Sequence, residues 1–380
     1  MSKKKSDVLM LLKCNGLQFD DRVRKECGSI FKVSGLNSEI HVVENDNKDA
    51  YGAIFETNTV FKSYHLITRK LFKGNRLLFI KLLEFFFKVM PSTLTRRKAV
   101  WLHDPLMFVF VPYFSFLKKI GIIELLIWDQ HELPPSYFLK NKLLKFFYKS
   151  AMGMVDVRIH ANKQRADYLN ELLNENYSYM VLNNYVDNIF SLEPAKPLSS
   201  DAMTWLNGEQ FLLLQSGAYY ERNFSSVVEA VCSYSSLKCI VVGGSDVDLS
   251  EYQAKYKNFD ELFFFVGMVP QIRLVDFIDQ AKASLILYKD SIPNSYFCEP
   301  NRLYQASCRG TFVIVGSNPP MKDFVELNNN GIVLKSDGQK AQDIIQALEY
   351  ISENELRKNK VASDWSVQEL VFSNVFSGGK

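Results

Sequence analysis

The sequence predicts an α/β protein of two domains, each a parallel sheet covered by helices. The chain has 380 residues, which is longer than a domain with a single hydrophobic core usually is. Short apolar runs alternate with helix-like stretches over residues 7–182, and the pattern restarts over 211–334. Such alternation is typical of parallel sheets with helices on both faces. Hydrophobic residues make up 47% and charged residues 23%, which excludes a disordered or fibrous chain.

The first half opens as strand, loop and helix. Behind a basic leader, the apolar run ends in a polar turn at Lys13–Asp20, and a helix-like stretch follows at Arg22–Phe31. The strand candidates of this half are Asp7–Leu12, Ile40–Val43, Ala99–Leu102, Leu125–Trp128, Val157–His160 and Tyr179–Leu182.

The second half repeats the pattern. Its strand candidates are Phe211–Leu214, Cys239–Val242, Leu262–Val266, Ser284–Leu287, Thr311–Val315 and Gly331–Leu334. Between the halves, Glu193–Ser200 contains two prolines and two serines, which is linker composition. We therefore predict one domain at residues 1–190 and a second from 191 to 360.

Charge is distributed unequally between the halves. Residues 1–190 carry 28 Lys and Arg against 19 Asp and Glu, whereas the remainder carries 17 against 23. A basic half beside an acidic half indicates that one face meets a polyanion, either anionic lipid or nucleic acid.

Cysteine usage and hydropathy limit the compartment and the membrane topology. The six cysteines lack CxxC or Cys/His metal spacing, and no signal peptide precedes the first strand candidate. We expect a reducing cytosol and no zinc site. No apolar run reaches the roughly 18 to 20 residues of a membrane span without a charge. The protein is expected to lie on a membrane rather than cross it.

Ligands of open parallel sheets bind outside the carboxyl ends of the strands, and two such sheets facing each other form a cleft suited to a phosphorylated donor. No G-x-G-x-x-G follows the first strand candidate, and the close glycine pair after a strand is Gly243 and Gly244. A dinucleotide oxidoreductase is therefore a weak alternative.

Three motifs in the first half carry a family resemblance. Residues 20–26 read DDRVRKE, residues 102–105 read LHDP, and residues 128–132 read WDQHE. They resemble the "D-P-R-V-x-x-E-A" helix start and the "H-D" and "D-x-H-E" strand ends of glycosyltransferase family 4 and its GT-B relatives.

The second half extends the resemblance over most of the chain. Residues 214–217, followed by Arg222, are similar to the first glycine loop of the family's donor domain. Residues 299–314 read EPNRLYQASCRGTFVI and resemble "P-N-K-L-F-E-Y-M-A-A-G-x-P-V-I". Asp364–Ser366 is like the closing "S-W" element, which implies that residues 361–380 form a helix packing back on the first domain.

The resemblance implies two Rossmann-like domains facing a central cleft and a sugar transfer from a nucleotide-sugar donor, with retention of anomeric configuration. His131 is the first candidate against the donor sugar, and His103 and Asp104 are the second choice. No cofactor or metal is expected, since this class relies on cations and helix dipoles. Asp246-Val247-Asp248 has metal-motif spacing, but we expect it to cap the helix that follows.

Donor binding is assigned to the second half. The diphosphate leaving group needs positive charge and N–H dipoles. The candidates are Arg222 and Arg302 for charge, Gly217 and Gly244 for close backbone approach, and Glu299, Asn301 and Gln305 at the motif of residues 299–314. Gln305 stands where the family has a glutamate that accepts from the ribose hydroxyls, and a glutamine still offers one acceptor.

Two stretches have the composition of interfacial amphipathic helices. Arg69–Lys98 interleaves nine basic residues with Phe and Leu, and Phe138–Lys149 repeats the pattern. We expect Lys81, Lys88, Arg96 and Arg97 to bind an anionic membrane surface, with a peripheral location at the inner face of the cell membrane. The alternative is that both are ordinary helices with buried faces. The acceptor is expected to be a lipid-linked glycan, and nucleic acid is not an expected partner.

The sequence also allows two other functions. Gln305 together with Ala218 and Asn223, which stand where the family often has an arginine and a lysine, allows a non-catalytic GT-B partner in a glycan assembly complex. A sugar-nucleotide epimerase would act on its nucleotide sugar without an acceptor. The sugar, the base and the linkage depend on a few polar contacts that one sequence does not rank.

Overall fold

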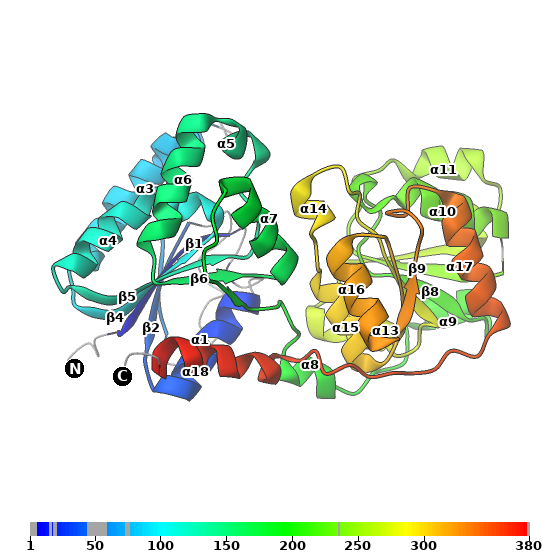
Figure 1. Cartoon of the computed structure of the whole chain (residues 1–380). Helices are drawn as coiled ribbons and strands as arrows, with labels where there is room; N and C mark the ends of the chain where they lie inside the picture. The colour runs from blue at the N-terminus through cyan, green and yellow to red at the C-terminus, as the bar shows by residue number, and fades with distance from the viewer. Residues whose placement is uncertain are drawn as a thin grey trace. The chain divides into compact units, whose positions relative to one another are not determined.

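The computed structural model describes residues 6–14, 17, 21–43, 59–72, 77–234 and 236–377. The chain divides into two compact units (Figure 1). Unit 1 is Met1–Asn183 with Gln368–Lys380, and unit 2 is Asn184–Val367. The predicted domain ranges had placed the first boundary at 190/191, next to the linker at Glu193–Ser200. The basic leader, most of the predicted polar turn, and Asp20, Lys73 and Arg76 lie outside the described residues.

Unit 1 is built on a seven-stranded sheet in the order β3-β2-β1-β4-β5-β6-β7. All its neighbouring strands are parallel. The strands are β1 (Val8–Lys13), β2 (Ser38–Val43), β3 (Val60–Ser63), β4 (Arg97–His103), β5 (Ile123–Gln130), β6 (Val157–His160) and β7 (Met180–Val181). The strand order reverses between β1 and β4, and ligands of such sheets bind at the carboxyl ends around this switch point.

Unit 2 repeats the design with a six-stranded sheet in the order β10-β9-β8-β11-β12-β13. Its neighbouring strands are also parallel. The strands are β8 (Phe211–Leu214), β9 (Lys238–Val242), β10 (Phe263–Gly267), β11 (Ala283–Ile286), β12 (Phe312–Val315) and β13 (Gly331–Val333). Here the switch point lies between β8 and β11. The two doubly wound parallel sheets confirm the predicted fold class.

Burial on both faces explains why these strands read as continuous apolar runs. In β8, Leu212 and Leu214 belong to one hydrophobic cluster, while Phe211 and Leu213 belong to the cluster on the opposite face. Strand β3 is the exception, because Val60–Ser63 pairs on one side alone and alternates between exposed and half-buried residues. For that reason this edge strand has no apolar run and was not predicted.

Helices cover both sheets. Those of unit 1 are α1 (Asp21–Ser34), α2 (Ile67–Leu71), α3 (Leu78–Thr93), η3 (Pro105–Phe110), α4 (Val111–Lys119), α5 (Ser136–Lys140), α6 (Lys142–Met154), α7 (Lys163–Leu173) and α18 (Glu369–Ser377). Those of unit 2 are α8 (Asn188–Leu192), α9 (Ser200–Leu206), η4 (Tyr220–Arg222), α10 (Phe224–Tyr234), α11 (Leu249–Lys255), α12 (Phe259–Leu262), η5 (Gln271–Leu274), α13 (Val275–Ile278), α14 (Pro293–Tyr296), α15 (Asn301–Arg309), α16 (Pro319–Asn328) and α17 (Ala341–Glu353), with η6 (Trp365–Gln368) at its end.

The last helix completes the core of unit 1, far in sequence from the rest of that unit. Phe372 of α18 is fully buried and stacks on Trp101 of β4, with ring centroids 5.9 Å apart. Lys32 of α1 forms an ion pair with Glu369 of α18, with Nζ 2.7 Å from Oε1. Figure 1 shows α18 lying beside α1. The core of unit 1 therefore includes α18 as well as elements from the first half of the sequence.

The aspartates at 246 and 248 fix local structure in unit 2. Asp248 is the N-cap of α11, and its Oδ1 accepts from the backbone N–H of Ser250 at 3.0 Å. Asp246 Oδ1 accepts from the backbone N–H of Tyr220 at 2.9 Å. The helix-capping prediction for this pair is therefore confirmed for Asp248.

Two further findings concern membranes and cysteines. Among the described residues, no helix is both long and apolar enough to span a bilayer. All six cysteines are free thiols, and four of them are buried.

Candidate functional site

In unit 1, the predicted histidines stand at the carboxyl ends of two neighbouring strands. His103 is the last residue of β4, and His131 follows β5 directly. Two bonds tie the strand ends together: the backbone N–H of Asp104 donates to the carbonyl of Asp129 at 3.1 Å, and Trp128 Nε1 donates to the carbonyl of Asp104 at 3.1 Å. The structure therefore brings His103, Asp104 and His131 to one edge of the sheet.

Asp104 has a strained backbone, and its side chain caps a helix. Its φ is +83°, a region that residues other than glycine rarely adopt and that costs about 1–3 kcal/mol. Its Oδ1 accepts from the backbone N–H of Leu106 at 2.7 Å and so caps η3. Burial raises the pKa of the Asp104 carboxyl, although the Leu106 N–H and His131 lower it. One carboxyl oxygen is thus committed to the cap.

A buried charge network stands behind the histidines. Arg22 of α1 donates from Nε to Asp129 Oδ2 at 3.0 Å and from Nη2 to Asp129 Oδ1 at 3.0 Å. Its Nη1 donates to the carbonyl of Leu182 at 2.8 Å, and its Nε lies 2.9 Å from Glu26 Oε1. No role had been predicted for these residues. A usable signal was the Arg/Glu pair four residues apart on an otherwise buried helix face.

His103 is enclosed by this network. Its side chain is 1% exposed, with Nε2 at 3.5 Å from Glu26 Oε2 and Nδ1 at 3.7 Å from Asp129 Oδ2. Neither ring nitrogen makes a hydrogen bond within the part of the chain that the structure describes. Burial lowers the pKa of His103 to about 3; Asp129 opposes this shift, whereas His131 and Arg22 add to it. At neutral pH, His103 is an uncharged imidazole.

His131 is the more accessible of the two histidines. It is half-buried, its ring centroid lies 6.5 Å from that of His103, and its carbonyl accepts from Arg165. His103, Asp129 and His131 each offer an atom to a metal ion, all within 4.8 Å of one another. Both carboxylate oxygens of Asp129 already accept from Arg22, so a metal ion would stand beside a guanidinium. The positive charge of the guanidinium opposes a second cation at this position.

In unit 2, the predicted glycines bring two loops together. A Cβ on Gly217 would lie 2.2 Å from the carbonyl oxygen of Gly244, and the φ of Gly217 is +74°. Ala218 N–H donates to that same carbonyl at 2.9 Å. A Cβ on Gly244 would lie 2.5 Å from the Tyr219 hydroxyl. The contact that needs glycine here joins the loops after β8 and β9.

Two predicted arginines share one aromatic ring. The Arg222 guanidinium carbon lies 3.5 Å from the ring centroid of Tyr288, and that of Arg302 lies 5.3 Å from it. Tyr288 follows β11 and is 6% exposed. Neither arginine forms an ion pair with a carboxylate of the described residues. Burial lowers the pKa of Arg222, Tyr288 raises it, and Arg302 lowers it. Sequence reasoning had not identified Tyr288.

Gln305 is buried and already paired. It is 4% exposed, and its Oε1 accepts from the side-chain amide of Gln215, which follows β8. The next residue, Ser216, is 7% exposed, and its hydroxyl has no hydrogen-bond partner among the described residues. Gln215 and Ser216 are further polar groups at the switch point that the sequence analysis had not singled out.

The remaining donor-side predictions lie at the start of α15 and in the loop after η4. Glu299 and Asn301 are half-buried on either side of Pro300, the N-cap residue of α15. Asn223 has a φ of +54° and donates from Nδ2 to the carbonyl of Asp337 at 2.9 Å. Asn223, which stands where the family often has a cation, thus supports the loop at Asp337 in this chain.

Two of the four predicted membrane cations are corrected by the structure. Arg97 is 7% exposed and donates from Nη1 to the carbonyl of Ser6 at 2.6 Å, and its Nη2 pairs with Glu39 at 2.5 Å. Lys81 is also 7% exposed. Residues buried in unit 1 are not available to lipid headgroups, so both predictions were wrong.

The other two cations differ in exposure. Lys88 is partly exposed but donates to the carbonyl of His65 at 2.6 Å and pairs with Glu84 at 3.0 Å. Arg96 is exposed.

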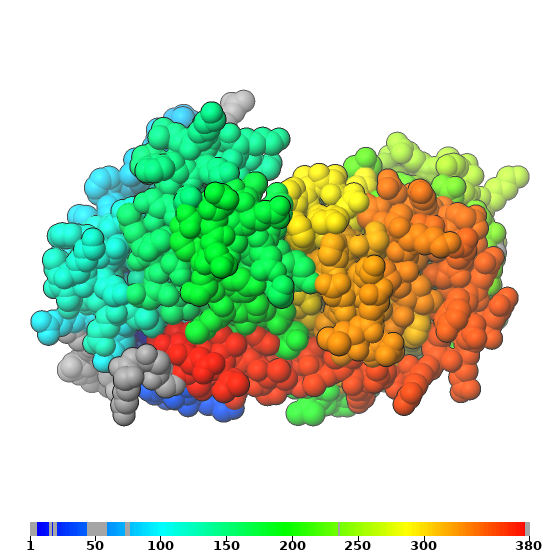
Figure 2. All heavy atoms as spheres, in the orientation of Figure 1, coloured from blue at the N-terminus to red at the C-terminus, as the bar shows by residue number. Residues whose placement is uncertain are grey.

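Large apolar side chains are exposed on α3 and α6. On α3 they are Ile80 at 45%, Leu83 at 52% and Phe87 at 62%, and on α6 they are Leu143 at 63%, Phe146 at 63% and Phe147 at 51%. Figure 2 shows the α6 segment at the surface of unit 1. We call these six residues the apolar surface of unit 1. Exposed large apolar side chains, where they gather in a patch, can form an interaction site.

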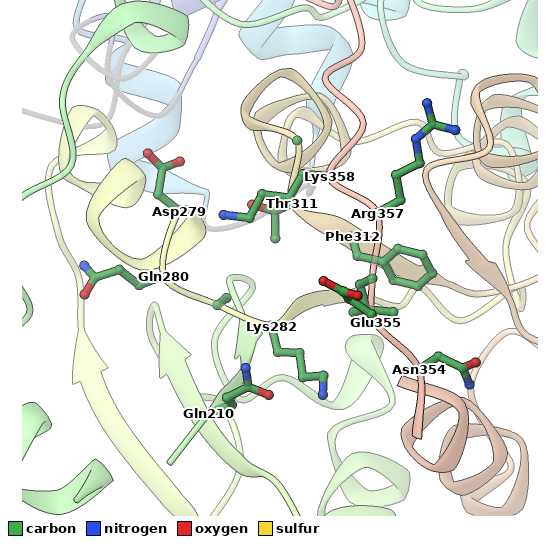
Figure 3. A pocket seen from close by; sticks show the side chains of 13 residues that line it. Gln210, Asp279, Gln280, Lys282, Thr311, Phe312, Asn354, Glu355, Arg357 and Lys358 are labelled. Atoms are coloured by element: carbon green, nitrogen blue, oxygen red, sulfur yellow. The ribbon is translucent and has the colours of Figure 1, made fainter. Parts of the chain in front are cut away.

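A separate pocket of about 380 Å³ lies at the opposite end of the unit 2 strands (Figure 3). Lys282 and Phe312, at the amino ends of β11 and β12, contribute to its lining. Of its two acidic residues, Asp279 and Glu355, the first accepts from Arg309 Nε at 2.7 Å, and Figure 3 shows Arg357 extending away from the other side chains. The pocket is therefore distinct from the switch-point residues.

Known proteins resemble part of the chain in sequence and nearly the whole chain in fold. Residues 204–365 match the family model described as Glycosyl transferases group 1. This segment contains every donor-side residue predicted from the sequence. No curated protein sequence matches the chain.

Solved structures match nearly the whole chain. Sucrose-phosphate synthase from Thermosynechococcus elongatus is 14% identical with a TM-score of 0.69, and the match covers 98% of each chain. HepE from Anabaena in complex with UDP is 11% identical with a TM-score of 0.64, again with 98% of each chain covered. WaaG, a glycosyltransferase involved in lipopolysaccharide biosynthesis, is 10% identical with a TM-score of 0.58, covering 98% of this chain and 94% of WaaG.

These sequence identities are too low for a substrate to be assigned by analogy. The structural matches nevertheless establish the two-domain architecture. The family match, in turn, covers most of unit 2. Residues 204–365 therefore match the family model of glycosyl transferases group 1, and the chain as a whole has the GT-B fold of these solved structures.

Proposed function

We propose that the protein transfers a sugar from a nucleotide-sugar donor to a lipid-linked glycan acceptor, with retention of configuration, in surface polysaccharide biosynthesis. One observation carries the donor half of this proposal. Arg222 and Arg302 converge on Tyr288 at the switch point of unit 2, and neither has a carboxylate partner among the described residues. Two guanidinium groups held together in this way favour an anion that bridges them.

A diphosphate fits this position chemically. As the bond to the sugar breaks, charge builds on the phosphate oxygens, and preorganised cations and N–H groups stabilise it. The start of α15, beside Asn301, adds backbone N–H groups and the positive end of a helix dipole. We propose that Glu299, Gln305 and the Ser216 hydroxyl contact the rest of the donor. HepE, of the same fold, is described in complex with UDP.

We assign sugar recognition to the strand ends of unit 1. The uncharged His103 and the more accessible His131 provide hydrogen-bonding groups for sugar hydroxyls, and Asp104 orders the loop that follows His103. The diphosphate charge is met by the arginines of unit 2, so the proposal includes no metal and no cofactor.

The acceptor half of the proposal rests on the apolar surface of unit 1. Exposed lysines at 140 and 142 accompany the exposed Leu143 and Phe146. Apolar side chains beside basic ones bind the interface of an anionic bilayer, and each basic residue contributes about 1 kcal/mol. A peripheral location at the cytoplasmic face of the membrane would place the enzyme beside lipid-linked acceptors. This composition favours lipid over nucleic acid.

The donor proposal is tested by thermal shift. We expect one nucleotide among UDP, GDP, CMP and dTDP, or its sugar conjugate, to raise the melting temperature, because a ligand that binds the native state stabilises it by about 2.7 kcal/mol at 100 times its Kd. Arg302→Ala should abolish the rise. Lys282→Ala, in the pocket at the other end of the strands, is the matched control and should retain it. No response from the folded protein would contradict donor binding.

A non-catalytic partner protein is the second candidate. It is favoured by Gln305, whose acceptor is engaged by Gln215, and by Asn223, which supports a loop. Donor binding without transfer or hydrolysis would favour this candidate. Formation of an epimerised nucleotide sugar without acceptor would instead identify an epimerase.

A further inference from the structure

We propose that Arg22 is a positioning residue of the candidate active site, which holds the Asp129 carboxylate behind His103 and thereby fixes the two histidine-bearing strand ends of unit 1. Its kinetic consequence rests on the proposed sugar transfer. The geometry itself belongs to unit 1 alone and is measurable without activity.

One guanidinium joins three separate elements of unit 1. Arg22 extends from α1, contacts both carboxylate oxygens of Asp129 near the end of β5, and donates to the carbonyl of Leu182 beyond β7. The side chains of Arg22 and Asp129 are 5% and 0% exposed. The planar fork of arginine makes this two-point contact, whereas lysine presents a single ammonium. The position of Asp129 is therefore tied to both helix and sheet.

Stability alone is a poor explanation for the pair. A buried ion pair loses hydration that its attraction often does not recover, and apolar replacements of similar volume are frequently neutral or stabilising. Here the charges lie directly behind the strand ends that carry His103 and His131. Positioning of that site explains a costly arrangement that a folded core does not require.

The path from Arg22 to the histidines is short. The Asp129 carbonyl accepts from the Asp104 N–H, which sets the loop after His103, and His131 is two residues beyond Asp129. The His103 ring stacks nearly parallel to the ring of Trp101, at an interplanar angle of 12° and with ring centroids 5.9 Å apart. A shift of Asp129 would therefore reach both imidazoles.

Arg22 also governs the charge around His103. The ionisable groups that face this ring are Arg22 and Glu26 from α1, Asp129 from β5, and His131 after β5. Burial would raise the pKa of Asp129, but Arg22, His131 and His103 bring it below its ordinary range, so Asp129 stays a carboxylate. Without the guanidinium, two carboxyl groups would favour a proton on His103.

The decisive variant is Arg22→Lys, which keeps the positive charge but loses the fork. We expect kcat to fall by roughly 100-fold, as misplacement of a site by about 1 Å does, with donor affinity unchanged within twofold. Arg24→Lys is the matched control. It lies on the same helix, and its guanidinium pairs with Asp21 rather than Asp129. Full activity in Arg22→Lys would overturn the proposal.

A second readout is independent of catalysis. In isotope-labelled protein, the five histidines can be titrated by NMR, and His103 should titrate near pH 3 in the wild type. Arg22→Met, of similar length and without charge, should move that titration upward. An unmoved titration would contradict the role of Arg22. A purely structural role would lower the melting temperature without changing kcat per folded molecule or the titration.

If the Arg22 variants fail to fold, Asp129→Asn takes their place. It keeps the shape and one acceptor for Arg22 but removes the charge that opposes the low pKa of His103. We expect the His103 titration to move further down and kcat to fall, and an unchanged kcat would reject the inference. A wild-type protein that binds no nucleotide would sink the proposed transfer, while the titration would still decide the role of Arg22.

Discussion

The guanidinium carbon of Arg222 stands 3.5 Å from the ring centroid of Tyr288, and the Arg302 guanidinium approaches the same centroid at 5.3 Å. An aromatic face attracts a cation by about 0.5–2 kcal/mol. A neutral ring can therefore hold two like charges near each other before an anion arrives. Tyr288 thus preorganises the proposed phosphate site.

The first prediction follows from that ring. Tyr288→Leu should weaken donor binding by about tenfold, because the loss of a desolvated cation–π contact of about 1.4 kcal/mol corresponds to a factor of ten. Tyr288→Phe keeps the ring and should bind within twofold of the wild type. Calorimetric titration with the nucleotide found by thermal shift measures both variants. Equal weakening in Leu and Phe would mean that the hydroxyl, rather than the ring, matters.

The second prediction concerns the apolar surface of unit 1. Leu143→Ser combined with Phe146→Ser should reduce co-sedimentation with anionic liposomes at least tenfold, because two exposed apolar side chains would no longer enter the interface. Melting temperature should be unchanged, since both side chains are solvent-exposed. Met203→Ser, at an exposed apolar residue of unit 2, is the control. Undiminished binding of the double variant would remove this surface from the proposal.

The third prediction concerns acid stability. Burial lowers the pKa of His160 to about 4 from an ordinary 6.5. The unfolded chain takes up this proton at the higher pH, so the stability from neutral His160 is present above pH 6.5 and is lost as the pH falls toward 4. The loss amounts to roughly 3 kcal/mol.

His160→Gln should therefore show a shallower fall of the free energy of unfolding between pH 6.5 and 4, measured by denaturant titration. The exposed His65→Gln serves as the control substitution, since it removes a histidine without opening the interior. The same slope in His160→Gln and wild type would show that this group does not drive acid unfolding.

The fourth prediction tests the last helix. Phe372→Ala should destabilise unit 1 by about 3–5 kcal/mol, because it removes a fully buried ring stacked on Trp101. Scanning calorimetry should show a lower unfolding temperature, whereas donor binding at a temperature where the variant is folded should persist. Leu370→Ala, at a 69% exposed residue of the same helix, should change little. Similar effects of the two substitutions would contradict this packing.

The fifth prediction concerns metals. Transfer activity should survive dialysis against EDTA, because Arg222 and Arg302 supply the charge that a metal would provide and Arg22 occupies Asp129. The measurement is turnover before and after chelation, with added Mg²⁺ or Mn²⁺ as the comparison. Activity lost on chelation and restored by one ion would require a metal at the site.

Much of the fold was predictable because burial on both faces leaves an unmistakable sequence pattern. Strands β6 and β8 have the predicted bounds, since each is a short run of buried or half-buried residues. Edge strand β3, half of it facing solvent, carries no such pattern. The motifs placed His103 and His131 at neighbouring strand ends, because parallel strands end at the same edge of a sheet.

The sequence by itself thus determined two parallel sheets, the strand ends where polar residues collect, and the arginines that now face Tyr288. Tertiary structure alone decided the partners. Arg22 meets Asp129 across 107 positions, and Arg97, which composition suggested for lipid, is buried against Glu39. Periodicity reports whether a side chain is buried, but the partner of a buried charge depends on which distant elements the fold brings within about 3 Å of it.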